Sequence, residues 1–151
     1  EGRLVLWDLI AYISKTYSPT SITSIATLTG ACIAALGYDY MGIMSKDVEY
    51  CLKCQNSINN WNDTAWMLPL DKYMIDSVKS ESVQLKNISP EMKAGSSLGG
   101  AFLSHFVDDS IAQYLHIDIA WPAFRPKQKW LFPMGATWAG TEAIIELAKM
   151  K

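Results

Sequence analysis

The chain has 151 residues, of which 50% are apolar, so it is long enough to bury the core of one ordinary domain. Its 13 basic and 15 acidic residues give a formal net charge of −2. Because no long run of like charges stands out, nucleic acid is not expected as a partner. The longest apolar run, residues 4–13, is interrupted by Asp8 and is shorter than the ~20 residues that cross a bilayer, so no membrane span is expected. The first residues show no signal-peptide pattern.

The chain has three cysteines, at positions 32, 51 and 54. An odd number does not make a disulfide framework, and the single Cys51-Leu-Lys-Cys54 pair would be only half of a zinc ribbon. We therefore expect reduced thiols in a cytoplasmic protein.

The chain opens with a pattern typical of a helix followed by a strand. Residues 4–17 have helical length and end before Pro19, since proline disfavours helical geometry in the residue that precedes it. Residues 21–28 are rich in β-branched side chains and predict a strand. They lead directly into a turn at Gly30, where Thr29 could cap a following helix.

The same alternation continues to the end of the chain. The predicted elements are a strand over 39–45, a helix over 46–61 with Ser45 as its cap, a short apolar piece over 66–70, a helix over 71–79, a long loop over 80–97, a helix over 97–107, a strand over 113–120 and a helix over 141–149. Strands alternating with helices predict one α/β domain, or part of one, with the three longer strands in one sheet and helices on both of its faces.

Two charged residues stand two positions apart just before the first helix. Glu1 and Arg3 lie where backbone amides and the helix dipole favour anions, so an oxyanion or metal site is one interpretation. The alternative is a pair of solvated charges at a chain terminus, which is where charged residues are usually found.

Several separated segments resemble one family in the same order. Residues 1–8, Glu-Gly-Arg-Leu-Val-Leu-Trp-Asp, resemble the second half of the Asn-Thr-Asp-Ala-Glu-Gly-Arg-Leu signature of leucine aminopeptidases. Residues 26–31 read Ala-Thr-Leu-Thr-Gly-Ala, as in a turn of that family, and residues 116–120 resemble its His-Leu-Asp-Ile-Ala strand. Shorter likenesses occur at residues 85–88, 99–103, 135–137 and 146–147. The whole chain, residues 1–151, resembles the C-terminal portion of the catalytic domain of these zinc-dependent enzymes.

The resemblance implies a partial catalytic domain with a three-layer α/β/α sandwich around a mixed sheet. It further implies a two-metal exopeptidase that removes N-terminal, preferably apolar, residues from peptides. Glu1 aligns with the carboxylate that bridges the two divalent ions, zinc or manganese. Arg3 aligns with the arginine that holds a bicarbonate acting as general base, a task that suits the planar fork of a guanidinium.

The resemblance also implies the contacts of the substrate. The carbonyl of Leu28 and the amide of Gly30 would contact the substrate backbone, while Thr27 and Ala120 would line the side-chain pocket. Without the resemblance, the segment around Gly30 reads equally well as a tight turn that closes a buried strand. Members of the family assemble as hexamers, so a homohexamer is implied as well.

Other features leave a second hypothesis open. The family's remaining metal ligands and lysines align before residue 1, so the chain alone is expected to be inactive. Trp7 replaces a small residue and is expected to crowd the first helix unless its neighbours shrink, and Trp121 replaces a glycine beside the expected pocket. A catalytically degenerate paralogue acting as a structural or assembly subunit is the alternative function. His105 and His116 are expected to be packed or capping residues rather than ligands.

Overall fold

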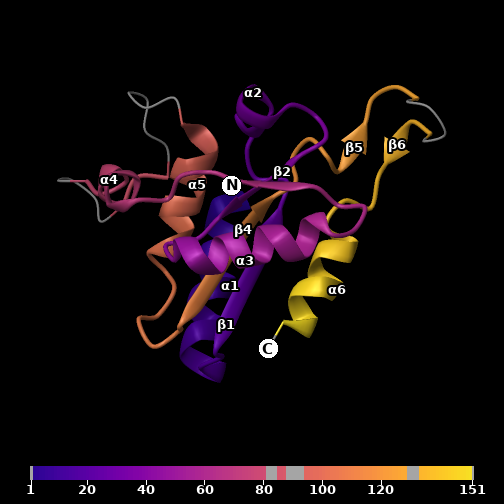
Figure 1. The fold of residues 1–151 in the computed structure, drawn as a ribbon. Helices are drawn as coiled ribbons and strands as arrows, with labels where there is room; N and C mark the ends of the chain where they lie inside the picture. The colour runs from indigo at the N-terminus through magenta and orange to yellow at the C-terminus, as the bar shows by residue number, and fades with distance from the viewer. Residues whose placement is uncertain (1, 81–84, 88–93, 129–132, 151) are drawn as a thin grey trace.

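A computed structural model describes residues 2–80, 85–87, 94–128 and 133–150 of the chain (Figure 1). Its elements are, in chain order, α1 (Gly2–Tyr17), β1 (Ser21–Ala26), α2 (Cys32–Leu36), β2 (Met41–Met44), α3 (Val48–Asn59), β3 (Ala65–Met67), α4 (Lys72–Ser77), α5 (Gly95–Ser104), β4 (Gln113–Asp118), β5 (Phe124–Arg125), β6 (Gly135–Ala136) and α6 (Thr141–Lys149). The predicted alternation of helices and strands is confirmed, and the last helix has the predicted bounds.

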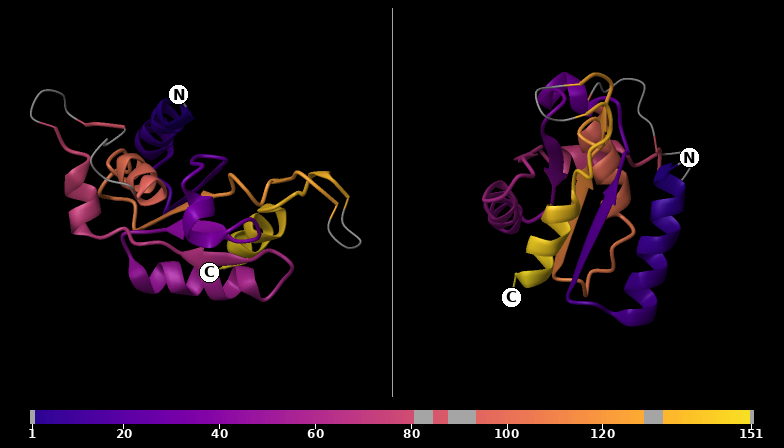
Figure 2. Two further views of the ribbon diagram at one scale, coloured as in Figure 1. Left: turned by 90° about the horizontal axis from the view of Figure 1, so that it is seen from above. Right: turned by 90° about the vertical axis from the view of Figure 1, so that its right-hand side faces the viewer.

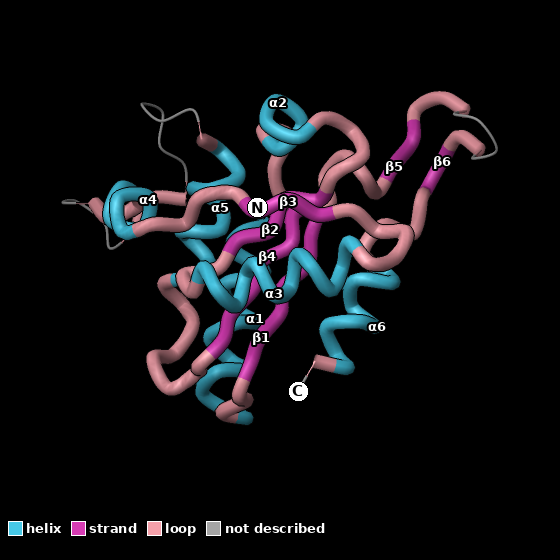
Figure 3. Tube along the Cα trace, in the orientation of Figure 1, coloured by secondary structure: helices cyan, strands magenta, loops and turns pink. Residues whose placement is uncertain are grey.

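Four strands form one mixed sheet in the order β1-β4-β2-β3 (Figure 3). β4 runs parallel to β1 and antiparallel to β2, and β2 runs parallel to β3. The predicted strands 21–28, 39–45 and 113–120 therefore belong to one sheet, as expected. β3 adds an edge strand where the sequence showed only a short apolar piece.

Helices cover both faces of this sheet, so the predicted three-layer sandwich is confirmed (Figure 2). On one face, α3 and α6 contribute to an apolar cluster that contains Leu115 and Ile117 of β4. On the other face, α1 and α5 pack with Tyr114 of the same strand. Successive residues of a strand point to opposite faces, which is why neighbouring β4 side chains belong to different clusters.

Trp7 does not crowd α1, contrary to expectation. Its ring stacks on Phe106 with centroids 4.8 Å apart, and it meets Phe102 edge-on at 6.4 Å. The indole thus packs into an aromatic cluster between α1 and the end of α5. Aromatic pairs at such distances are stabilising contacts.

The cap predicted for α3 is wrong by two residues. Asp47, not Ser45, caps this helix, since its carboxylate accepts a hydrogen bond from the Tyr50 amide at 3.0 Å. The Ser45 hydroxyl instead accepts a bond from the Asp47 amide at 3.2 Å. Both residues are good capping types, so the choice between them depended on where the preceding strand ends.

Other boundaries also moved. α5 is predicted over 97–107, but it begins two residues earlier and ends at Ser104. The predicted loop 80–97 lies partly outside the described residues. β5 and β6 form a small antiparallel ribbon that the sequence did not predict, because two-residue strands carry no measurable period.

Two features require a glycine at position 140: its backbone conformation and the close approach of Ile25. Gly140 adopts φ 88° at the start of α6, and a Cβ there would lie 2.4 Å from Cδ1 of Ile25. We expect Gly140→Ala to lower the free energy of unfolding by roughly 2–3 kcal/mol, since it combines a strained φ with a steric clash. Urea unfolding followed by circular dichroism measures this loss.

Gly135 offers the matched control. It has φ 123°, but a Cβ there would meet no atom within 4 Å. Gly135→Ala should therefore lower the free energy of unfolding only by the cost of the strained φ, about 1 kcal/mol. Equal losses for the two variants would contradict the packing argument.

Candidate functional site

Arg3 lies in the first turn of α1 and reaches toward the start of α5. Its guanidinium donates to the backbone carbonyl of Asn87 and, at 3.4 Å, to that of Gly95. Burial lowers the pKa of Arg3 from its ordinary value, and the carboxylate of Asp118 opposes this effect. Arg3 is thus a half-buried, positioned cation and not a solvated terminal charge. Glu1 lies outside the described residues.

Glycines of α5 allow the turn that follows β1 to approach closely. A Cβ on Gly99 would lie 3.0 Å from Cδ2 of Leu28 and 3.5 Å from Nε of Arg3. A Cβ on Gly95 would lie 2.8 Å from the Cβ of Ala31. The side chains of Arg3 and Leu28 therefore both lie next to Gly99. Arg3 thus lies beside the turn, as expected.

The carboxylate of Asp118 organises this turn. It is completely buried at the end of β4. Its Oδ1 accepts hydrogen bonds from the amides of Leu28 at 3.1 Å and Thr29 at 3.4 Å, and its Oδ2 accepts one from the Thr29 hydroxyl at 2.5 Å. Thr29 therefore does not cap α2 as predicted, because its hydroxyl faces Asp118 and lies 2.5 Å from the hydroxyl of Ser96.

The same carboxylate reaches the segment that follows β4. The amide of Ala120 donates to Asp118 Oδ1 at 3.1 Å, so Ala120 and the turn 27–30 are tied to one group. Sequence reasoning missed Asp118, although it belongs to the His-Ile-Asp-Ile-Ala motif. An acidic residue at the end of a buried strand was the available signal.

Trp121 stands next to the turn. Its indole N–H donates to the carbonyl of Gly30 at 3.0 Å, and its ring meets Tyr38 edge-on at 5.4 Å. The indole therefore takes up space beside Gly30 that a glycine at this position would leave open.

His116 is a packed core residue, as expected. It is fully buried on β4, and burial together with the nearby Arg3 lowers its pKa to about 3. Its Nδ1 lies 2.9 Å from the Ser24 hydroxyl, which lies 2.8 Å from the hydroxyl of Tyr114. Both Ser24 and His116 are buried, so these contacts belong to the packed interior. His105 is likewise structural, with Nε2 2.9 Å from the carbonyl of Ile75.

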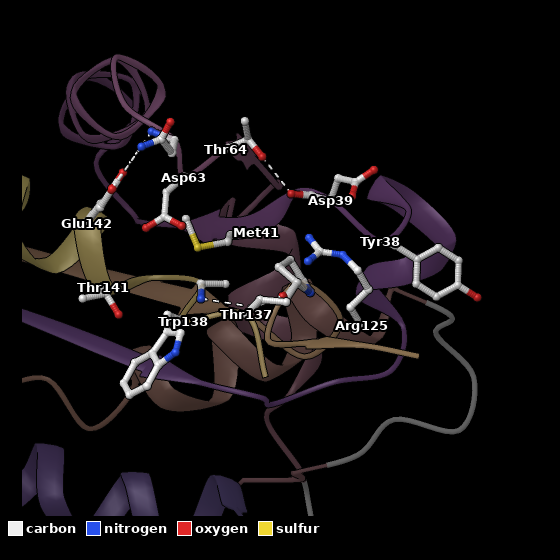
Figure 4. Close-up of a pocket in the computed structure, with 13 residues that line it drawn as sticks. Tyr38, Asp39, Met41, Asp63, Thr64, Arg125, Thr137, Trp138, Thr141 and Glu142 are labelled. Atoms are coloured by element: carbon white, nitrogen blue, oxygen red, sulfur yellow. Dashed lines mark hydrogen bonds between the residues drawn. The ribbon is translucent and has the colours of Figure 1, made fainter. Parts of the chain in front are cut away.

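Two neighbouring cavities lie away from Arg3, beside α6 and the β5–β6 ribbon. Their volumes are about 420 Å³ and 470 Å³, and they share Tyr38, Pro122 and Arg125. Figure 4 shows the first, with Asp63 and Glu142 on one side and Arg125 on the other.

Two of the carboxylates that line the first cavity, Asp63 and Glu142, have structural partners. Asp63 accepts hydrogen bonds from the amides of Gly140 and Ala143, and so caps α6, while Glu142 accepts two from Asn62. None of the residues predicted to bind substrate lines either cavity.

The described residues do not fit a metal ion by themselves. Within the described ranges, no three His, Cys, Asp or Glu side chains are grouped so that they could hold one. Asp118, which is in electrostatic range of Arg3, accepts hydrogen bonds on both oxygens. In the same part of the chain, no helix is long and apolar enough to cross a membrane.

Comparison with known proteins settles the family. The description "Cytosol aminopeptidase family, catalytic domain" belongs to a family profile that matches residues 1–145. The chain belongs to this family. The leucine aminopeptidase resemblance seen in the motifs is thereby confirmed.

Curated relatives support this membership. A probable cytosol aminopeptidase of Nitratidesulfovibrio vulgaris is 35% identical over 97% of the chain and 29% of its own length. Another, from Prochlorococcus marinus subsp. pastoris, is 36% identical over 100% of the chain and 30% of its own length. The chain thus spans about three tenths of the length of the curated relatives it matches.

Solved structures of similar fold include a leucine aminopeptidase and a maturation enzyme. A mutant of tomato leucine aminopeptidase superposes with a TM-score of 0.84 at 28% identity, over 96% of this chain and 27% of that one. The bottromycin maturation enzyme BotP, solved also in complex with Mn, gives 0.86 at 25% identity, over 96% of this chain and 32% of that one.

Proposed function

We propose that this chain supplies the C-terminal portion of the active site of a metal-dependent aminopeptidase. The enzyme removes N-terminal, preferably apolar, residues from peptides. One observation carries the proposal: Arg3 and Leu28 pack against the same glycine of α5, and Asp118 ties the turn of Leu28 to Ala120. Three segments far apart in sequence thus converge where the family resemblance implies a site.

Arg3 is proposed to bind an oxyanion, a bicarbonate that acts as general base. The described hydrogen bonds of its guanidinium go to two backbone carbonyls, and a guanidinium has five N–H donors. Its partial burial supports the role, because a charge that is less screened by water attracts an anion more strongly.

The turn after β1 is proposed to hold the substrate backbone. The Leu28 carbonyl would accept from the substrate and the Gly30 amide would donate to it. Thr27, which is exposed, and Ala120, which is half-buried, would line the pocket for the leaving residue's side chain. Short and apolar lining groups suit an apolar side chain.

Two divalent ions, zinc or manganese, are part of this proposal, with Glu1 as the carboxylate that bridges them. When bound, such ions polarise a scissile carbonyl and lower the pKa of water. Since the chain spans about three tenths of the length of its curated relatives, the remaining ligands would come from parts of the catalytic domain outside this sequence. The 151-residue chain alone is therefore expected to be inactive. A homohexamer in the cytoplasm is the proposed assembly.

Metal analysis tests the assignment of Glu1. In a full-length protein that carries this sequence, Glu1→Ala should lower the zinc or manganese bound per chain after dialysis, because two cations would lose a shared carboxylate. Asp8→Ala, which removes an exposed carboxylate from α1, is the matched control and should keep the metal. Full metal content in the Glu1 variant would refute its role as a ligand.

The second candidate is a catalytically degenerate paralogue that serves as a structural or assembly subunit. The observation in its favour is Trp121, whose indole is bonded to the Gly30 carbonyl and fills space beside the proposed substrate turn. Hydrolysis of leucine amide by the folded full-length protein, supplied with zinc or manganese, decides between the two. Absence of any hydrolysis would favour the paralogue.

A further inference from the structure

The hydrogen bonds of Asp118 indicate a role besides packing. The side chain is fully buried and accepts four hydrogen bonds, three of them from backbone amides on two separate segments. Two of these amides belong to consecutive residues, Leu28 and Thr29. One carboxylate therefore fixes two successive peptide planes of the same turn.

The direction of the carbonyls follows from those two bonds. All peptide bonds of the described residues are trans, and in a trans peptide the N–H and C=O groups point in opposite directions. The Leu28 amide shares its plane with the Thr27 carbonyl, and the Thr29 amide shares its plane with the Leu28 carbonyl. Because both amides point inward at Asp118, both carbonyls point away from it, on a turn whose outer residues Thr27 and Gly30 are exposed.

We infer that Asp118 is a positioning residue that aims the Leu28 carbonyl at the substrate backbone. The inference rests on the proposed function, since that function makes the Leu28 carbonyl a substrate contact. Asp118 itself does not touch the substrate. It acts by holding the turn in the one orientation that presents the carbonyl, and by joining that turn to Ala120.

Supporting contacts keep the carboxylate itself in place. The Thr29 hydroxyl binds Asp118 Oδ2 and lies 2.5 Å from the hydroxyl of Ser96, in the first turn of α5. A group whose partners are all ordered gives the turn little freedom to rotate. Displacing such a turn by about 1 Å is enough to cost a hundredfold in rate, because substrate alignment is that sensitive.

Asp63 provides a matched control within the same chain. It too is a carboxylate that accepts bonds from two backbone amides, those of Gly140 and Ala143. These amides belong to the start of α6, which none of the proposed substrate contacts occupies. Comparing the Asp63 and Asp118 variants thus separates a loss of stability from a loss of the carbonyl's orientation.

The experiment uses steady-state kinetics with leucine amide on full-length variants that carry this sequence. Asp118→Ala should lower kcat/KM about tenfold to a hundredfold, mainly through a higher KM. Asp118→Asn keeps an acceptor oxygen for the three amides and should stay within about threefold of wild type. Asp63→Ala should lose a similar amount of thermal stability without changing KM.

Hydrogen exchange supplies a readout that does not depend on activity. In the full-length variants, Asp118→Ala should speed exchange of the Leu28, Thr29 and Ala120 amides about tenfold or more, and Asp63→Ala should not. If Asp118→Ala does not fold, Asp118→Glu replaces it. That variant keeps the charge but shifts the carboxylate by a methylene, so KM should rise relative to Asp118→Asn.

Each outcome is decisive. An unchanged KM in Asp118→Ala, or in Asp118→Glu if that variant is used, would overturn the positioning role, most clearly if the three amides exchange faster. Equal increases of KM in the Asp118 and Asp63 variants would overturn it as well. A wild-type protein without activity would instead defeat the proposed function on which the inference rests.

Discussion

Arg3→Ala in the full-length protein is expected to lower kcat by roughly two to three powers of ten while metal content stays nearly unchanged. Removing one electrostatic contact to a transition state has an effect of this size. Arg3 is half-buried beside the turn of Leu28, so its charge acts at short range and with little screening by water. Kinetics on leucine amide, with metal analysis on the same preparations, measure both quantities.

Two controls separate the role of Arg3 in binding an oxyanion from its contacts with the backbone. Arg3→Lys keeps the charge but loses the planar fork, so about a tenfold loss is expected. Bicarbonate should accelerate the wild type and leave Arg3→Ala unaffected. Because Arg3 also donates to Asn87 and Gly95, the melting temperature of each variant must be compared with that of the wild type. An Arg3→Ala variant with unchanged kcat would remove the catalytic role.

His116 should make the fold sensitive to acid. Its pKa is about 3 in the folded chain because it is fully buried and near Arg3, whereas an unfolded histidine titrates near 6.5. Between these values the unfolded state binds more protons, so the free energy of unfolding falls as the pH falls. The slope contributed by His116 approaches about 1.4 kcal/mol per pH unit, and the loss reaches roughly 4–5 kcal/mol near pH 3. Above pH 7 this contribution is constant.

Urea unfolding of the 151-residue chain at several pH values between 7.5 and 4.5 tests this prediction. His116→Asn keeps a polar atom near Ser24 but cannot titrate, so its stability should depend less on pH over this range. His105, the chain's other histidine, provides the comparison variant His105→Gln, measured over the same pH values. A wild-type slope in the His116 variant would contradict the assignment.

The sequence by itself determined the class of the fold. Runs of β-branched residues such as 21–28 and helical runs such as 141–149 are local patterns, and local patterns are what periodicity detects. They fixed the alternation of elements and, with the ordered motifs, the family. The cap of α3 could not be predicted in this way, because Ser45 and Asp47 are equally suitable residue types. Which of them caps the helix depends on where β2 ends.

The site depended on contacts that no local pattern records. The Leu28 amide and Asp118 are 90 residues apart, and they meet only because β1 pairs in parallel with β4 and both strands end at the same edge of the sheet. The motif therefore showed that an aspartate was present, but not that its oxygens face two consecutive amides. Likewise, the sequence predicted that Arg3 stands at the start of a helix. Only the structure shows that Arg3 lies beside the turn of Leu28, because Gly99 has no side chain to keep the two apart. Hydrogen bonds and steric fit between distant segments appear only when the sheet and its helices have packed together.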